Sequence, residues 1–308
     1  MRIVFMGTPD FSVPCLQALI DDGHDVCAVF TQPDKPKGRH GILTQPPVKE
    51  LALKYNIPVY QPKTFRTDEA KELFKSLDAE LAIVVAYGKI LPDELLHTPK
   101  YGCINMHASL LPKLRGAAPI QWAVITGEKR TGVTSMQMDA GIDTGDMLLS
   151  KSVDIGENET AEELHDRLSV LGAEVMRETI SALQAGELHP VKQDDKQSTH
   201  APILTKELSK IDWNDTAQHI HDKIRGLYSW PGATCEFNGK VIKIHSSRLA
   251  GECSGKPGEV SESDKRLVVC CGDGNAVEIL VLQAPGKRAM PAGDFLRGNP
   301  IEKGAFFE

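Results

Sequence analysis

Residues 101–146 contain an amide, an imidazole and several carboxylates at spacings that suit acyl transfer. Asn105 and His107 stand two residues apart in the β-rich run CINMHAS, so their side chains should leave the same face of a strand. One reacting carbonyl could contact both, and donors aimed at it would stabilise the tetrahedral oxyanion of acyl transfer. The glycine-rich turn DAGIDTGD carries Asp139, Asp143 and Asp146. One of these carboxylates could orient the imidazole and pass on a proton from an incoming amine.

Each of these residue types also has an ordinary structural explanation. An isolated asparagine is commonly a turn or cap residue, and a histidine on a strand is commonly a satisfied core or surface group. The motif SLLP directly downstream could be only a proline-terminated strand end. It is the conjunction of Asn105, His107, SLLP and Asp143 that favours a catalytic set.

The elements that would position these residues alternate along the first half of the chain. The β-rich runs RIVFMG, VCAVFTQP, LAIVVAYG, CINMHAS and GVTSMQM are separated by amphipathic segments. This alternation predicts an α/β fold, a Rossmann-like, mostly parallel sheet with flanking helices. Ligands bind beyond the carboxyl ends of such strands, where Asn105, His107 and the DAGIDTGD turn are expected. Gly7-Thr8-Pro9 lacks the glycine run of dinucleotide binders, so no NAD or flavin is expected.

The remainder of the chain divides into a linker and a second domain. Thr160 and Glu163 form a capping box that predicts a long helix ending at Gly186. The polar residues 189–205 predict a linker, so the expected domains are 1–188 and 206–308. Asn238-Gly239 and the turn at 272–275 predict tight hairpins, which indicate a small OB-like antiparallel β-barrel after one helix.

Composition narrows the class of protein. The net charge of −7 argues against bulk coating of nucleic acid, although local patches can still bind phosphate. The seven cysteines are scattered without zinc spacing, so neither disulfides nor a metal are expected. No apolar run is long enough to span a bilayer and the N-terminus lacks signal-peptide features, which predicts a cytoplasmic protein.

Several segments together resemble the folate-dependent formyltransferases. The resemblance lies in INMHASLLPKLRGAAPIQWA and TGVTSMQMDAGIDTGDML, and it extends over VFMGTPDFSVPCL, TQPDKPKGR, VVAYGKILP and APILTKELSKIDW. It implies a formyl-transfer domain of Rossmann-like topology and an OB-like C-terminal domain. It also implies that 10-formyltetrahydrofolate, as co-substrate, donates a formyl group to the amino group of methionine on initiator tRNA for translation initiation.

The resemblance also implies roles for individual residues. Asn105, His107 and Asp143 would be the catalytic set, and VVAYG would offer backbone groups to a pterin. The folate contact of the SLLP motif would fall on Ser109, Leu110, Leu111 and Pro112, where two leucines could line an apolar slot for a flat ring.

The stretch 31–49 concentrates Lys35, Lys37, Arg39 and Lys49 against one acid, Asp34. A solvated surface loop is the simplest explanation, but cations near an active-site rim would also attract tRNA phosphates. The resemblance implies that this loop reaches the tRNA acceptor stem, which makes Lys35, Lys37 and Arg39 candidate tRNA contacts.

The start of the second domain interleaves cations with aromatic residues, a pattern that suits an RNA surface on an OB-like barrel. The aromatic motifs DWN and WPGA could equally anchor a domain interface. The cations are Lys206, Lys210, Lys223, Arg225, Lys240, Lys243 and Arg248, and the aromatic residues are Trp213, Tyr228 and Trp230.

Two alternative functions stay open at this point. The same site could formylate a small amine, such as a glycinamide ribonucleotide or an amino sugar, although that leaves the barrel without a purpose. A non-catalytic RNA-binding module is the other alternative, and the intact Asn105, His107 and Asp143 speak against it. No obligate protein partner is indicated, and a monomer is expected.

Overall fold

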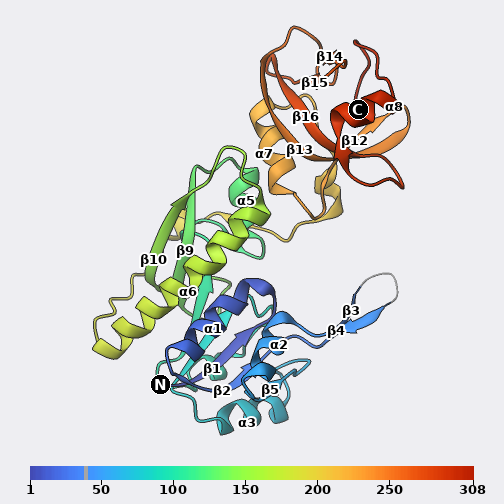
Figure 1. Ribbon diagram of the computed structural model, residues 1–308. Coiled ribbons are helices and arrows are strands. Elements are labelled where there is room, and N and C mark those ends of the chain that lie inside the picture. Colours follow the sequence, from blue (N-terminus) through green and yellow to red (C-terminus); the bar gives the residue numbers. More distant parts are fainter. Residues whose placement is uncertain (38–40) are drawn as a thin grey trace. The chain divides into compact units, whose positions relative to one another are not determined.

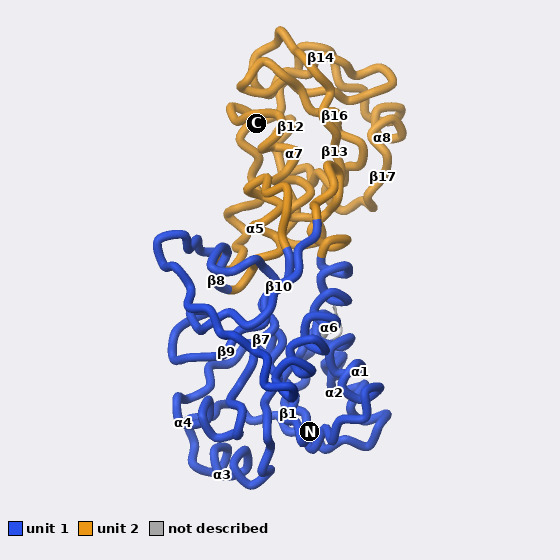
Figure 2. The backbone as a smooth tube through the Cα atoms, turned by 90° about the vertical axis from the view of Figure 1, so that its left-hand side faces the viewer, with its two compact units in different colours: residues 1–116, 132–153, 165–200 blue, residues 117–131, 154–164, 201–308 orange. Residues whose placement is uncertain are grey.

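The structure is a computed structural model of the 308-residue chain, and it describes residues 1–37 and 41–308. The chain forms two compact units, which Figure 2 distinguishes by colour. Unit 1 comprises Met1–Gly116, Gly132–Val153 and His165–His200, and unit 2 comprises Ala117–Thr131, Asp154–Leu164 and Ala201–Glu308. Unit 2 therefore contains two short segments that come from within the expected first domain, residues 1–188.

A seven-stranded sheet is the main feature of the first half (Figure 1). Its strands, in spatial order, are β10 (Met147–Asp154), β9 (Arg130–Gln137), β7 (Cys103–His107), β6 (Leu81–Val85), β1 (Arg2–Gly7), β2 (Asp25–Phe30) and β5 (Val59–Tyr60). The pairs from β7 to β5 are parallel, as the alternating pattern predicts. β9 runs antiparallel to β7, so the sheet is mixed.

Helices connect these strands, and local sequence signals explain their ends. The Thr67 hydroxyl accepts from the Ala70 amide at the start of α3, and Thr160 and Glu163 exchange the predicted capping-box hydrogen bonds at the start of α6. α6 stops before Gly186, whose φ of +71° suits a glycine. These helices are α1 (Val13–Asp21), α2 (Pro47–Lys54), α3 (Asp68–Ser76), α4 (Asp93–Leu96), α5 (Pro119–Ile125) and α6 (Ala161–Ala185), with a short 3₁₀ turn η1 (Asp10–Ser12) before α1.

An aromatic core fixes one face of the sheet. Phe30 of β2 contacts Phe65 and Phe74, with ring centroids 5.4 and 5.9 Å apart, and Phe65 also meets Tyr87 at 6.2 Å. All four side chains are almost completely buried. Burial of such rings stabilises the sheet by several kcal/mol, which keeps the ends of β1, β2 and β6 in fixed relation.

Two small ribbons lie outside the main sheet. β3 (Lys35–Lys37) pairs antiparallel with β4 (Ile42–Thr44) inside the predicted basic loop. β8 (Arg115–Gly116) pairs with β11 (His200–Ala201), which belongs to the segment expected to be a linker. That segment also contains a 3₁₀ turn, η2 (Asp195–Gln197).

The last hundred residues form an antiparallel sheet with two α-helices and one 3₁₀ helix. The Asn238-Gly239 turn has the two positive φ angles, 50° and 69°, of the predicted hairpin. The helix α8 was not predicted. The strands are β12 (Ala233–Phe237), β13 (Lys240–Glu252), β16 (Asn275–Gln283), β15 (Leu267–Cys270) and β14 (Val260–Glu262) in spatial order, with β17 (Met290–Pro291) on β16; the helices are η3 (Lys206–Ser209), α7 (Ala217–Gly226) and α8 (Ala292–Gly298).

The expected fold class is confirmed, whereas one expectation about cysteines is wrong. A Rossmann-like sheet with flanking helices is followed by an antiparallel β region. Cys253 and Cys270 form a disulfide with Cα atoms 5.6 Å apart, although the scattered spacing had indicated none. None of the helices in residues 1–37 and 41–308 has the length and apolar content needed to cross a membrane.

Candidate active site

Strand β7 presents the predicted amide and imidazole side by side. Asn105 pairs with Met136 on β9, and His107 pairs with Thr134 two positions further along the same ladder. Because strand side chains alternate, Asn105 and His107 share one face of the sheet, as expected. In the part of the chain that the structure describes, the partly exposed Asn105 amide has no hydrogen-bond partner. It is therefore available to a ligand.

The imidazole of His107 is buried between two oxygen atoms. Its Nε2 lies 2.9 Å from the Leu114 carbonyl oxygen, and its Nδ1 lies 3.5 Å from Oδ2 of Asp143. The side chain is only 6% exposed. An imidazolium can donate to both oxygens, whereas a neutral ring can donate to one of them. The two oxygens therefore fix the orientation of the ring.

Asp143 reaches this imidazole by an indirect route. Since β9 is antiparallel to β7, the loop after β9 starts beside Cys103, where the Met138 amide donates to the Cys103 carbonyl. This is the opposite end of β7 from His107. We expected the DAGIDTGD turn to follow a strand that ends at the same edge of the sheet as His107. That expectation is wrong, because β9, the strand before the turn, ends at the opposite edge. The loop runs back along the sheet to bring Asp143 to the ring.

Local geometry explains the residues of this loop. Asp139 accepts from the Gly141 amide and the Thr144 hydroxyl, so it is a turn residue. A Cβ on Gly145 would overlap the Gln137 carbonyl oxygen, which requires glycine there. Asp143 has a φ of +54°, and its Oδ2 accepts from the Gly116 amide at 2.8 Å. The same oxygen therefore faces both an amide and the imidazole.

The SLLP segment forms a tight loop directly after β7. The Ser109 hydroxyl donates to the Lys113 carbonyl at 2.7 Å. The Thr134 hydroxyl accepts a hydrogen bond from the Leu111 amide and donates one to the Ser109 carbonyl. Leu111 is buried, whereas Leu110 and Pro112 are partly exposed. Of the two leucines, Leu110 has the more accessible side chain.

Nearby polar groups tie the ends of β1, β2 and β6 together. The Tyr87 carbonyl in VVAYG accepts from the Thr8 hydroxyl and the Gln32 side chain. The Tyr87 hydroxyl is buried without a partner among the described residues, and burial raises its pKa. Gly7 cannot carry a side chain, because a Cβ would meet Ser12 and the ring of Phe5.

Among the described residues of the basic loop, one of the predicted cations is paired. Lys49 forms an ion pair of 2.8 Å with Asp34 and a hydrogen bond to Gln61, so it anchors the base of the β3–β4 ribbon. The Lys49 partnership holds the pKa of Asp34 below its usual value. Lys35 is exposed, and Lys37 lies on β3. Arg39 lies outside the described residues.

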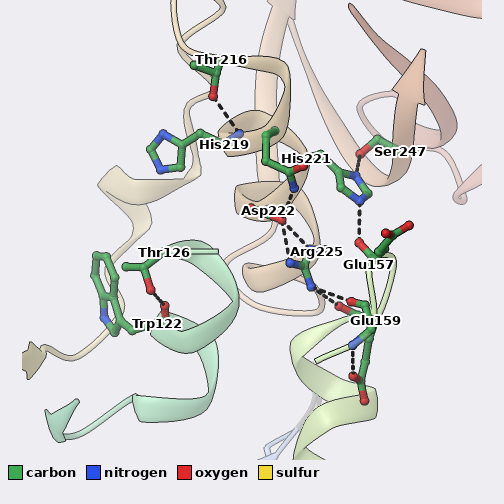
Figure 3. Close-up of polar contacts among 12 residues, drawn as sticks. Trp122, Thr126, Glu157, Glu159, Thr216, His219, His221, Asp222, Arg225 and Ser247 are labelled. Atoms are coloured by element: carbon green, nitrogen blue, oxygen red, sulfur yellow. Dashed lines mark hydrogen bonds and ion pairs between the residues drawn. The ribbon is translucent and has the colours of Figure 1, made fainter. Parts of the chain in front are cut away.

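The cations at the start of the second domain also separate into two groups. Arg225 is buried, pairs with Asp222 at 2.6 Å and donates to the Gly156 and Glu159 carbonyls, so it cannot contact RNA (Figure 3). Lys223 donates to the Lys210 carbonyl, and burial lowers its pKa. Arg248 pairs with Glu278. The exposed cations of the set are Lys206, Lys210, Lys240, Lys243 and Arg248, the last with a side chain that is 55% exposed despite its ion pair.

Sequence reasoning missed Gln193, which lies in the expected linker. Its side chain is 5% exposed and donates to the carbonyl oxygens of Asp143 and Gly145, at 2.9 and 2.7 Å. No pattern of residue types marks it, because its partners lie about fifty positions away in the chain.

Comparison with known proteins places this geometry in context. Residues 1–180 match the family model described as Formyl transferase, and residues 203–300 match Formyl transferase, C-terminal domain. The chain is 50% identical over 305 residues to the methionyl-tRNA formyltransferase of Alkaliphilus oremlandii, covering 99% of this chain and 98% of that protein. It is 51% identical over 306 residues to the methionyl-tRNA formyltransferase of Geotalea uraniireducens, covering 99% and 97%.

A solved structure supplies a likeness in fold. WlaRD, a sugar 3N-formyl transferase crystallised in the presence of dTDP and 5-N-formyl-THF, has a TM-score of 0.72. The match covers 94% of this chain and 99% of that one at 21% sequence identity. At this identity the likeness concerns the arrangement of the elements.

Proposed function

Since the chain belongs to the formyl transferase family, we propose that it transfers the formyl group of 10-formyltetrahydrofolate to the α-amino group of methionine on initiator tRNA. The observation that carries this proposal is the identity of about half the residues, over the full length, to relatives named methionyl-tRNA formyltransferase. The product would serve translation initiation.

Asn105, His107 and Asp143 form the proposed catalytic set. The amine nitrogen attacks the formyl carbon, a tetrahedral intermediate forms, and the bond from that carbon to N10 of the folate breaks. The Asn105 amide supports the role of oxyanion donor because its side chain has no other partner within the described residues. Such a donor contributes about 3 kcal/mol to the transition state.

The His107–Asp143 pair is proposed to stabilise the charge that develops during the reaction and to take up the proton that the attacking amine loses. The attacking amine must lose a proton and N10 must gain one, so no net proton is consumed. Asp143 stabilises positive charge on the imidazole, since its Oδ2 lies 3.5 Å from Nδ1. The carboxylate is 16% exposed and can exchange a proton with a bound amine. No covalent intermediate on the protein is required.

The folate contacts proposed are Ser109, Leu110, Leu111 and Pro112. The loop fits such a ligand because Leu110 keeps an accessible apolar side chain next to the strand that carries Asn105 and His107. Ser109 and Leu111 hold the loop in shape through Lys113 and Thr134. When bound, the folate supplies the activated formyl group.

Initiator methionyl-tRNA is the proposed partner of Lys35, Lys37 and Arg39. The exposed Lys35 on the β3–β4 ribbon supports phosphate contact. We also propose the division into a formyl-transfer domain at 1–188, a linker at 189–205 and a tRNA-binding domain at 206–308. The two family matches, at 1–180 and 203–300, support that division.

The test is to incubate purified protein with 10-formyltetrahydrofolate and either charged initiator tRNA or small amines. The small amines are an amino-sugar nucleotide and glycinamide ribonucleotide. We expect N-formylmethionine on the tRNA and no turnover of the small amines. Formylation of a small amine without any formylmethionyl-tRNA would refute the substrate assignment and favour the small-amine alternative.

Substitution of His107 tests the site itself. His107→Ala should lower kcat by orders of magnitude while tRNA affinity, measured by filter binding, changes little. His97→Ala is the matched control, because that histidine is exposed at the C-cap of α4. Equal losses of turnover and tRNA affinity would instead assign His107 a binding role.

A further inference from the structure

A single buried glutamine holds the loop that carries Asp143. The Nε2 of Gln193 donates to the carbonyl oxygens of Asp143 and Gly145, at 2.9 and 2.7 Å. Its Oε1 accepts from Nε of Arg115 at 2.9 Å. A side-chain amide has two N–H donors, so both are used on this loop. The side-chain amide of Gln193 therefore binds the Asp143 turn through its nitrogen and Arg115 through its oxygen.

The Asp143 loop has a reason to need such an anchor. It is closed at its base by the hydrogen bond of 2.9 Å from the Gln137 amide to the Asp146 carbonyl, beside the start of β7. The imidazole lies at the other end of that strand. Asp143 itself has a left-handed backbone, which costs free energy for a residue with a side chain. Without outside contacts, the carboxylate would not be held at one distance from His107.

The tripeptide 114–116 contacts His107, Gln193 and Asp143. The Leu114 carbonyl contacts Nε2 of His107, the Arg115 side chain contacts Gln193, and the Gly116 amide donates to Oδ2 of Asp143. A closed ring of contacts therefore runs from the Asp143 carboxylate through Gly116, Arg115 and Gln193 back to the Asp143 carbonyl. The ring fixes Asp143 at both its backbone and its side chain.

Arg115 is itself held in place. Its Nη2 pairs with Asp195 at 2.9 Å, and its backbone amide donates to the Thr199 carbonyl at 2.9 Å. Gln193, Asp195 and Thr199 all lie in the segment expected to be a linker. That segment therefore determines where the Asp143 loop lies.

We propose that Gln193 is a positioning residue for formyl transfer, acting through Asp143 and supported by Arg115. This inference rests on the proposed function, because Gln193 acts through Asp143, whose catalytic role is part of that proposal. Gln193 itself contacts neither substrate. Gln193 sets the distance between the carboxylate and the imidazole. Its loss should therefore affect the chemical step and leave substrate binding almost intact.

The test is Gln193→Met, which keeps the length of the side chain and removes its donors and acceptor. We expect kcat to fall on the order of 100-fold, the effect of displacing a catalytic group by about 1 Å. The KM values for tRNA and folate should stay within about 3-fold. Gln197→Met is the matched control, since Gln197 is exposed in the same segment and, among the described residues, its side chain bonds only Asp194. It should leave kcat unchanged.

A double substitution separates positioning from general damage. If Gln193 acts through Asp143, then Gln193→Met in an Asp143→Asn background should lower kcat by less than about 3-fold more. An equal loss in both backgrounds would overturn the proposal, as would a folded Gln193→Met protein with unchanged kcat. A rise in the KM for tRNA at constant kcat would also overturn it.

A second variant covers the case in which Gln193→Met does not fold. Gln193→Glu keeps the size and the contact with Arg115 but points a carboxylate oxygen at two carbonyl oxygens, so the same fall in kcat is expected. Circular dichroism and the thermal midpoint identify folded protein. An unsubstituted chain that formylates no methionyl-tRNA would refute the proposed function. An active chain insensitive to both Gln193 variants would refute only this inference.

Discussion

The buried pair of Asp222 and Arg225 offers the sharpest prediction about stability. Their side chains are 4% and 5% exposed, and Nη2 of Arg225 lies 2.6 Å from Oδ1 of Asp222. Asp222→Ala leaves a buried guanidinium without its counter-ion. Arg225→Met leaves a buried carboxylate and removes the donors to the carbonyls of Gly156 and Glu159. Each substitution should lower the free energy of unfolding by about 3–5 kcal/mol.

The double variant provides the decisive comparison. Asp222→Ala with Arg225→Met buries neither charge, so it should cost at least about 2 kcal/mol less than the sum of the single substitutions. Breaking the pair is expensive because one charge stays behind. Removing both charges leaves the lost packing, the two carbonyl contacts and the lost hydrogen bond from Gln218 to Asp222.

Urea unfolding followed by tryptophan fluorescence is the appropriate assay, because Trp122, Trp213 and Trp230 all belong to unit 2. Arg297→Met is the matched control: Arg297 pairs with Asp294 at the same sequence spacing but is 77% exposed. Its loss should cost less than about 1 kcal/mol. Single substitutions of the buried pair that cost as little as this control, or a double variant equal to the sum, would refute the reasoning.

Three further predictions concern other sites. Tyr87→Phe removes a hydroxyl that is buried without a partner in the described chain, so the variant should be as stable as the natural protein or more stable by about 1 kcal/mol; a clear loss in urea unfolding by circular dichroism would contradict this. Burial lowers the pKa of His221, so the unfolded chain binds a proton more readily as the pH falls below 6.5. Stability should then decrease between pH 6.5 and 5, and less so in His221→Gln; identical pH slopes would show that His221 contributes nothing. Lys35→Ala should weaken tRNA binding and reduce its logarithmic salt slope by about one, and an unchanged slope would exclude a phosphate contact.

The sequence predicted the elements that depend on local patterns. The strand that carries Asn105 and His107, the capping box at Thr160 and the Asn238-Gly239 hairpin follow from alternation, caps and turn residues, and all are present. The proximity of His107 to Asp143 was also expected, and the two side chains do meet. Their catalytic role stays a prediction that the substitutions above will test.

Other features depend on contacts between distant residues and have no local signature. The antiparallel direction of β9 is set by its pairing with β7, which residue types do not reveal. Arg225 looked like an exposed cation because charge alone does not show that Asp222 lies beside it in a buried place. Gln193 looked like part of a polar linker for the same reason.

The composition of unit 2 has a consequence for synthesis of the chain on the ribosome. Residues 117–131 and 154–164 emerge early, yet their packing and hydrogen-bond partners in α7 are made much later. Gly226 of α7 lies so close to Ile125 that a Cβ could not be accommodated. The packing of α5 is therefore complete only after α7 has been synthesised. At typical rates of translation that delay is on the order of ten seconds. During that interval the apolar surface of α5 is exposed to chaperones, and a chain that stops before α7 would be an aggregation-prone nascent fragment.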